Sequence, residues 1–337
     1  MKKNILITGS AGFIGFHLTK LLLEKNYNII GIDALTDYYD VKLKKERLKI
    51  LKKSKNFHFF KIKLENKTQI NKIFKRYRPV GIIHLAAQAG VRHSIEHPED
   101  YISTNIIGTF NILESCRNFK PKHILIASTS SVYGANDKIP FKETDKADDQ
   151  VSIYAATKKS TEVLGHSYSY NFSLPITFFR FFTVYGPWGR PDMALFLFTK
   201  NILENKKINV FNYGKMYRDY TYVEDLVKSI QLLINKPPKI VKRNKINGDS
   251  ISPVAPFRII NIGNSKKVQL IEFIKILEKE LGKKAKINLM PMQQGDVEKT
   301  FADTTLLKKL TGYKGKTNIK IGIKHFVKWY KEFYKSY

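Results

Sequence analysis

A glycine-rich turn near the beginning of the sequence constrains the fold more than any other feature. It lies between a short apolar segment, Ile5–Thr8, and an amphipathic stretch, Gly12–Lys25, and its glycines recur at every third position. Glycines in a strand-to-helix turn let the backbone approach a pyrophosphate, which accepts hydrogen bonds from free N–H groups at the helix N-terminus. The motif therefore predicts a dinucleotide site, and a tight turn without a ligand is the alternative. The predicted cofactor-binding residues of this turn are Gly9, Gly12, Phe13, Ile14 and Gly15.

Short apolar segments alternate with amphipathic ones along the first half of the chain. We expect helices at Gly12–Lys25 and Lys42–Leu51. The expected strands are Ile5–Thr8, Ile29–Asp33, Phe57–Ile62, Ile82–Leu85 and Ile124–Ala127. This alternation predicts an α/β fold, a Rossmann-type doubly wound parallel sheet with helices on both faces. Ligands of such sheets bind beyond the carboxyl ends of the strands.

The pattern becomes less regular after about residue 183. The segment Asn235–Pro256 has no apolar period and is expected to be an exposed excursion. A strand at Ile259–Gly263 and helices at Gln269–Leu281 and Ile321–Tyr334 follow it. We predict a dinucleotide-binding domain at residues 1–183, and a smaller substrate-binding region at residues 184–337 that is partly interleaved with it.

Composition limits the classes of partner. A net charge of +30 could indicate a polyanion-binding protein, but the lysines are scattered along the chain, without an aromatic-interleaved basic stripe. We therefore expect no nucleic-acid partner. No apolar run is long enough to span a membrane, and the apolar stretch after Met1 is too short for a signal peptide. Cys116 is the only cysteine. These features predict a cytoplasmic protein without a membrane partner.

Asp33 ends the second predicted strand, at the position that selects the cofactor. A carboxylate at this position accepts hydrogen bonds from the ribose hydroxyls of NAD and repels the 2′-phosphate of NADP. The predicted cofactor is therefore NAD.

Tyr154 and Lys158 are four residues apart and follow a run of hydroxyl side chains that includes Thr129. On a helix the two side chains share one face, so the positive charge of Lys158 is expected to lower the pKa of Tyr154. A tyrosine with a lowered pKa can act as a general base on an alcohol. Thr129 is expected in the loop after the strand that ends near Ala127, where it would hydrogen-bond the reacting oxygen. These three residues are the predicted catalytic residues.

Several longer stretches resemble the extended short-chain dehydrogenase/reductase family, which contains NAD-dependent epimerases and dehydratases. Within that family they are similar to the branch that interconverts UDP-glucuronate and UDP-galacturonate. The resemblance covers nearly the whole chain. The stretches that carry it begin at Asp37, Leu85, Phe181, Met216 and Asn261, and Gly-Pro-Trp-Gly-Arg-Pro at residues 186–191 is the most discriminating.

The resemblance implies NAD-dependent 4-epimerisation of a UDP-sugar through a 4-keto intermediate, together with the residues that bind both molecules. The further NAD-binding residues that it implies are Leu64, Ala86, Ala87, Gln88, Asn105, Tyr154 and Lys158. The substrate-binding residues that it implies are Arg92, Thr129, Ser130, Ser131, Thr183, Arg190 and Arg218. Among these, Arg190 and the hydroxyl groups would hold the sugar carboxylate, and Arg218 would contact the diphosphate. The family also implies a homodimer formed through helices near residues 105–116 and 152–170.

Two departures from the family pattern affect the interpretation. Lys63 stands where related enzymes usually have an aspartate that contacts adenine, so NAD affinity is in question. Ser130 and Ser131 replace the Asp-Glu pair of 4,6-dehydratases, which disfavours dehydration. The alternatives are a 4-epimerase of a neutral or N-acetylated UDP-hexose, a UDP-glucuronate decarboxylase, and a nonenzymatic NAD- or polyanion-binding protein.

His93 and His97 have the spacing of a helical metal-binding pair. Pro98 follows at once and the sequence offers no evident third ligand, so we predict no metal.

Overall fold

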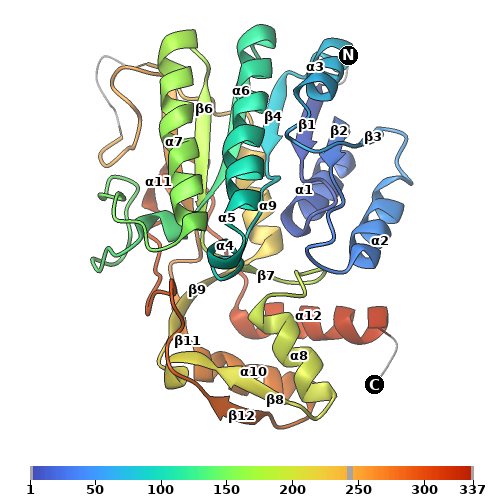
Figure 1. Ribbon diagram of the computed structural model, residues 1–337, viewed down its shortest axis with the longest axis vertical. Helices are drawn as coiled ribbons and strands as arrows, with labels where there is room; N and C mark the ends of the chain where they lie inside the picture. The colour runs from blue at the N-terminus through green and yellow to red at the C-terminus, as the bar shows by residue number, and fades with distance from the viewer. Residues whose placement is uncertain (1–2, 241–245, 335–337) are drawn as a thin grey trace.

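The computed structural model describes residues 3–240 and 246–334. A large α/β body carries a smaller region at one end, and this region contains α8, α10 and α12 (Figure 1). The strands are β1 Asn4–Thr8, β2 Asn28–Asp33, β3 Phe57–Lys61, β4 Gly81–His84, β5 His123–Thr129, β6 Ile176–Phe181, β7 Thr183–Tyr185, β8 Lys207–Val210, β9 Tyr217–Tyr222, β10 Phe257–Ile262, β11 Lys267–Gln269 and β12 Lys286–Leu289.

The α-helices of the described chain range from single turns to the long α7. They are α1 Phe13–Glu24, α2 Val41–Leu51, α3 Lys67–Tyr77, α4 His93–Glu96, α5 Pro98–Tyr101, α6 Gly108–Phe119, α7 Ile153–Phe172, α8 Ala194–Leu203, α9 Val223–Leu233, α10 Leu270–Leu281, α11 Thr305–Thr311 and α12 Ile319–Tyr334. A π-helical segment, η1 Ile102–Ile107, joins α5 to α6. Two short 3₁₀ segments are η2 Ser130–Tyr133 and η3 Phe211–Gly214.

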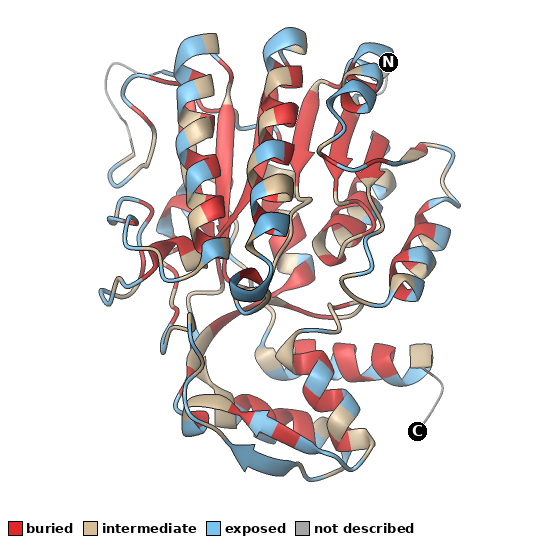
Figure 2. Cartoon of the chain, in the orientation of Figure 1, coloured by how far each residue is buried: buried red, intermediate tan, exposed pale blue. Residues whose placement is uncertain are grey.

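The central sheet has seven parallel strands in the order β10-β6-β5-β4-β1-β2-β3. Alternate residues of a strand point to opposite faces, and here both faces are covered. Leu6 faces the core formed with α3 and α6, whereas Ile5 and Ile7 face the core formed with α1 and α9. Figure 2 shows the resulting band of buried strands between exposed helix surfaces. The predicted Rossmann-type fold is confirmed.

The smaller region lies at the carboxyl end of this sheet. Its core contains aromatic residues of α8, α12 and β9, among them Phe196, Trp329 and Tyr220. The division of the chain is not sequential, because β10 joins the edge of the large sheet and α9 packs against α1. The boundary at 183/184 as a functional division stays a prediction.

One predicted element boundary was wrong in a place that concerns the site. Thr129 is the last residue of β5, paired in register with Phe181 of β6, and the loop begins only at Ser130. Polar Ser128 and Thr129 continue the strand because the neighbouring strand β6 also extends that far. Thr129 is therefore fixed by sheet hydrogen bonds. No helix within the described ranges is long and apolar enough to cross a bilayer.

Candidate active site and cofactor-binding site

The glycine turn has the tight backbone that a dinucleotide site requires. Gly9 adopts a φ of +72°, and its N–H donates to the carbonyl of Ile32 at 2.7 Å. A Cβ atom on Gly15 would lie 1.9 Å from the carbonyl oxygen of Gly9, so no other residue fits there. Gly12 is the N-cap of α1 and offers no side-chain cap to the first N–H groups of the helix. These donors therefore fit a pyrophosphate.

Asp33 lies at the end of β2, beside the glycine turn. Its carboxylate accepts hydrogen bonds from the backbone N–H of Ala11 at 3.0 Å and of Leu35 at 2.8 Å. Each carboxylate oxygen has two lone pairs, so each retains one for a ribose hydroxyl. The geometry fits the predicted role of Asp33 in NAD binding, which stays a prediction.

Arg47 is a buried residue of the site that the sequence did not indicate. It has no exposed surface, and its NH1 donates to the carbonyl of Ala11 at 2.9 Å and to the hydroxyl of Tyr39 at 2.8 Å. Its NH2 donates to the carbonyl of Trp188 at 2.5 Å. Arg47 thus joins the glycine turn to the loop that precedes Arg190. The lysine-rich sequence of α2 gave no sign that one of its cations would be buried.

Asn105 connects the loop after β4 to the catalytic helix. Its Oδ1 accepts from the backbone N–H of Gln88 at 2.8 Å, and its Nδ2 donates to the Gln88 carbonyl and to the hydroxyl of Thr157, both at 3.0 Å. Thr157 is adjacent to Lys158 on α7. Ala86 is held separately, by a 3.1 Å hydrogen bond from its N–H to Thr8 Oγ1. The loop that contains Ala87 is therefore fixed at both ends.

Leu64 lies after β3, where the adenine contact of related enzymes is expected. Its side chain is buried, and its carbonyl accepts from Asn111 Nδ2 at 2.9 Å. Lys63 beside it is exposed and supplies no carboxylate. At the expected adenine position, the chain therefore offers the apolar side chain of Leu64, and residue 63 supplies no acidic group.

Tyr154, Lys158 and Thr129 come together at the junction of α7 and β5. Lys158 and Thr129 are buried, with 3% and 7% of their surface exposed. Tyr154 hydrogen-bonds with Thr129 and packs edge-on against Tyr101, with ring centroids 6.1 Å apart. These contacts match the arrangement expected for the trio, while its catalytic role stays a prediction.

The prediction that Lys158 lowers the pKa of Tyr154 was wrong for the protein chain by itself. Burial raises the pKa of Tyr154, and the groups that oppose this rise are the hydroxyl of Thr129 and the charge of Arg190. Burial also lowers the pKa of Lys158 to about 8, against a raising effect of Glu162. Burial disfavours the charged form of both side chains, and the spacing of the two residues does not reveal how deeply they are buried.

Arg190 is held by an acidic neighbour. Its Nε and NH2 donate to the two carboxylate oxygens of Asp192, at 3.0 and 2.5 Å, and its guanidinium lies 5.7 Å from the ring centroid of Tyr38. Tyr38 donates to Asp192 at 3.3 Å. Because Arg190 has five N–H donors, its NH1 group remains available to a substrate carboxylate. The charge of Arg190 also acts on Tyr154, so the two groups lie within electrostatic reach.

The four hydroxyl residues predicted beside Arg190 lie on three elements, and Thr129 is the one that ends β5. Ser131 follows β5 in η2, and its hydroxyl accepts from Thr129 at 3.2 Å. Ser130 begins η2, and Thr183 begins β7, where it pairs with Tyr220 of β9. Their contact with a sugar carboxylate stays a prediction.

Arg218 and Arg92 meet near Asp296. Arg218 NH1 donates to the carbonyls of Tyr217 and Glu298, at 3.0 and 3.1 Å. Arg92 lies 3.6 Å from the Asp296 carboxylate, and the charge of Asp296 acts on both arginines. Two cations that share one carboxylate leave a net positive charge, which suits a diphosphate.

Asp219, which sequence reasoning missed, supports Arg218 from within the small region. It is fully buried and accepts hydrogen bonds from backbone N–H groups of Asn264, Ser265 and Ala302, at 2.7 to 3.2 Å. It thereby fixes β9 to two later loops. These contacts have no local sequence pattern from which they could have been predicted.

The histidine pair differs from the sequence expectation in one respect. His93 starts α4, and His97 follows the end of this helix. Glu96 is a third potential metal ligand, which the sequence had not suggested. The potential ligand atoms of the three residues all lie within 4.8 Å of one another. Glu96 and His97 are exposed, and Asp100 lies 3.9 Å from His93 as a competing partner. We assign no metal to this group.

Comparison with known proteins identifies the class. The family model described as GDP-mannose 4,6 dehydratase matches residues 6–326. The chain therefore belongs to the extended short-chain dehydrogenase/reductase family of NAD-dependent epimerases and dehydratases, as its sequence predicted.

Individual relatives show which enzymes of this family the chain is similar to. A probable UDP-glucuronate 4-epimerase of Rhizobium meliloti is 47% identical over 98% of this chain and 97% of its own length. UDP-glucuronate 4-epimerase 4 of Arabidopsis thaliana is 42% identical over 98% of this chain and 76% of its own length. The crystal structure of UDP-glucuronic acid 4-epimerase from Bacillus cereus, in complex with UDP-glucuronic acid and NAD, superposes with a TM-score of 0.88 at 32% identity, over 98% of this chain and 100% of that one.

The close approach of Gly15 to Gly9 generates a test of the cofactor site. Gly15→Ala should reduce NAD affinity roughly 10- to 100-fold, because a shift of the turn costs about 1–3 kcal/mol. NAD retained through purification, and titration of the cofactor-free protein, measure this. Gly282→Ala is the control, since Gly282 lies outside the turn and an added Cβ would meet no atom within 4 Å, although its φ is positive. It should lower stability by about 1 kcal/mol and leave NAD affinity unchanged. Equal NAD affinity of both variants would contradict the assignment of the turn.

Proposed function

We propose that this protein is a UDP-glucuronate 4-epimerase, which interconverts UDP-glucuronate and UDP-galacturonate with bound NAD. The observation that carries the proposal is the contact of Tyr154 with Thr129 at the carboxyl end of the sheet, with the buried Lys158 one helical turn after Tyr154 on α7 and Arg190 within electrostatic reach of the tyrosine. Relatives that carry this name cover nearly the whole chain.

Tyr154 accepts the proton of the C4 hydroxyl and later returns it, and Thr129 hydrogen-bonds the reacting oxygen. Lys158 contributes positive charge when protonated, which favours the tyrosinate. When bound, NAD supplies the hydride acceptor for C4 and the hydride donor for the opposite face of the 4-keto sugar. Arg218, with Arg92, binds the diphosphate, so that the sugar can turn about an anchored link. In this assignment the NAD fits between the glycine turn and α7.

The sugar carboxylate sets a particular requirement. A ketone at C4 and a carboxylate at C5 form a β-keto acid, which tends to lose CO₂. Arg190 holds the carboxylate away from the geometry that leads to decarboxylation, and the hydroxyls of Ser130, Ser131 and Thr183 assist it. Because Asp192 already orients the guanidinium, Arg190 does not need to be ordered by the substrate.

Incubation of the purified protein with UDP-glucuronate, followed by proton NMR, tests the function. UDP-galacturonate is expected without added NAD if the cofactor is retained, and after NAD is added if it is not. Tyr154→Phe should reduce the rate by about 10²- to 10⁴-fold, since it removes the general base. Formation of a UDP-pentose and CO₂ would identify a decarboxylase instead. Turnover of neutral or N-acetylated UDP-hexoses alone would identify a different epimerase.

Arg190 provides the test of sugar specificity. Arg190→Ala should lower kcat/KM for UDP-glucuronate roughly 10- to 150-fold, because a hydrogen bond to a charged group contributes about 1.5–3 kcal/mol. Any activity on UDP-glucose should change much less, since that sugar has no carboxylate. Arg76→Ala, at an exposed arginine of α3, is the control and should leave both rates unchanged. An equal loss on both sugars would contradict the assignment of Arg190 to the carboxylate.

We also propose that two copies associate through η1, α6 and α7. Large apolar side chains are exposed on these neighbouring elements, with Ile102, Ile107, Val163 and Tyr170 between 46% and 61% exposed. The helices α6 and α7 stand side by side on one face of the body (Figure 1). The exposed apolar residues of η1 and α7, with α6 beside them, form a face that fits a second copy of itself, which would complete a four-helix contact.

Val163→Glu should convert the dimer to a monomer at micromolar concentration, because it places a charge in the apolar contact. Analytical ultracentrifugation measures the change. Ile321→Glu is the control, because Ile321 is a comparably exposed apolar residue of α12, outside the proposed contact. A wild-type protein that sediments as a monomer would refute the proposal.

The proposed location is the cytoplasm. Cys116 is a free, buried thiol, which suits a reducing compartment. The proposed partners are a UDP-sugar and a second copy of the chain, without nucleic acid or membrane.

A further inference from the structure

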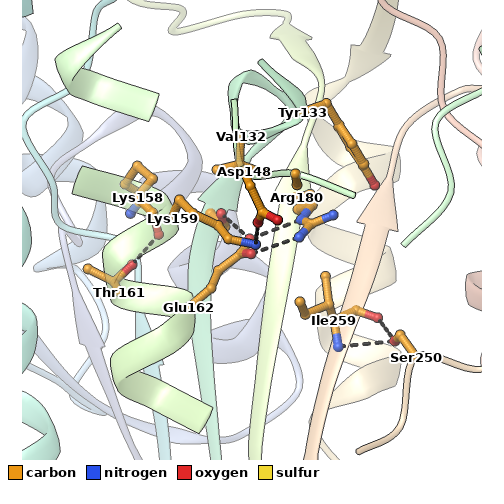
Figure 3. A network of polar contacts seen from close by, with 12 residues as sticks. Val132, Tyr133, Asp148, Lys158, Lys159, Thr161, Glu162, Arg180, Ser250 and Ile259 are labelled. Carbon is orange, nitrogen blue, oxygen red and sulfur yellow. Dashed lines mark hydrogen bonds and ion pairs between the residues drawn. The ribbon is translucent and has the colours of Figure 1, made fainter. Parts of the chain in front are cut away.

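A buried ion pair lies directly behind the catalytic residues. Arg180 of β6 donates from Nε and NH2 to the two carboxylate oxygens of Glu162 on α7, at 3.0 and 2.8 Å. Each side chain is only 2% exposed. Figure 3 shows the two groups facing each other between the helix and the strand. Neither residue was predicted to have a function.

The pair is connected to the end of β5. Ser128 donates to Glu162 Oε1 at 2.6 Å, and Ser128 is paired in register with Arg180 itself. The guanidinium of Arg180 also lies 4.7 Å from the ring centroid of Tyr133, which follows β5 in η2. One carboxylate therefore ties the carboxyl ends of β5 and β6 to the middle of α7. This arrangement therefore also holds Thr129, the next residue after Ser128, in position.

The pair is also connected to Lys158. Glu162 is one helical turn after Lys158 on α7, and its charge raises the pKa of this lysine against the effect of burial. The other titratable groups around Lys158 are Tyr154 on the same helix and His84 on β4. His84 is held neutral by burial, which lowers its pKa to about 3. Glu162 is therefore the carboxylate whose negative charge acts on Lys158 in the described chain.

Stability alone does not explain such a pair. Removing two charges from water is costly, and apolar residues of the same volume often stabilise a protein equally or better. A buried carboxylate beside a lysine of the active site has an additional effect, because it favours the charged form of that lysine.

We propose that Glu162 and Arg180 are positioning residues for the epimerase reaction: Glu162 keeps the Lys158 ammonium charged and holds Ser128 and Thr129 in place, and Arg180 fixes the carboxylate for both tasks. This inference rests on the proposed function and deepens it. Neither residue touches the substrate. The prediction concerns the alkaline side of the pH profile, where loss of the Lys158 proton ends activity.

The test compares pH profiles of kcat for UDP-glucuronate. Glu162→Gln should move the alkaline limb to lower pH by about one to two units, since Lys158 loses its stabilising charge. Glu162→Asp, which retains the carboxylate, should lie nearer the wild type. Arg180→Met should also move the limb to lower pH, because a buried carboxylate without its cationic partner takes up a proton and no longer acts on Lys158. Asp148→Asn is the control: Asp148 pairs with Lys159 at 3.5 Å but is exposed, and no shift is expected.

A second measurement does not depend on turnover. Pulsed acetylation of the cofactor-free protein across pH, read by mass spectrometry of the peptide that contains Lys158, follows the deprotonated amine directly. The midpoint should fall in both Glu162→Gln and Arg180→Met. If a single variant does not fold, the double variant E162Q/R180M removes both charges and should still shift the midpoint downward, by a smaller amount.

The outcomes separate the two proposals. A wild-type protein inactive on UDP-glucuronate would refute the proposed function, while the acetylation midpoints would still test the pair. Lower rates of Glu162→Gln at every pH, with no shift of limb or midpoint, would show a purely structural pair and overturn the inference.

Discussion

The parallel register of the central sheet is the constraint on which the site depends. Because all seven strands run in one direction, their carboxyl ends form a single edge. That edge brings together Gly9 after β1, Asp33 of β2, Ala86 after β4 and Thr129 of β5, although they are distant in the sequence. The smaller region then adds its arginines to the same edge through β7 and β9. In the proposed assignment, the Rossmann-type sheet provides the cofactor side, and the irregular second half of the chain provides the substrate side.

Features with a local signature could be predicted from the sequence. The glycine turn, the strand-end Asp33 and the Tyr154–Lys158 spacing each depend on residues within one or two elements, so their pattern is visible in the chain. The buried contacts were not predictable in this way. Glu162 and Arg180 are 18 residues apart and Glu162 and Ser128 are 34 apart, and only the packing of α7 on the sheet brings them together. Composition likewise concealed Arg47 and Lys44, the two buried cations of the lysine-rich helix α2.

The electrostatics of Tyr154 illustrate a second limit of sequence reasoning. Spacing placed a positive charge near the phenol, and this implied a lowered pKa. Burial has the opposite effect on the phenol, and it also weakens the charge of Lys158. The activity of such a pair therefore depends on what surrounds it. Here Thr129, Arg190 and Glu162 provide the surroundings, and each comes from a different part of the chain or a different turn of the helix.

Arg47 connects the cofactor side of the proposed active site to its sugar side. It bonds the carbonyl of Ala11 in the glycine turn and the carbonyl of Trp188 in the loop before Arg190. Separation of these two loops would leave the buried guanidinium with only the hydroxyl of Tyr39 as an acceptor, so Arg47 opposes their separation. An epimerase reduces and reoxidises the same dinucleotide in every cycle and gains nothing by exchanging it. In the proposed epimerase, a movement of the sugar side that displaced Trp188 would pull on Arg47 and, through it, on the glycine turn, so one side chain would connect release of the product to the hold on the cofactor.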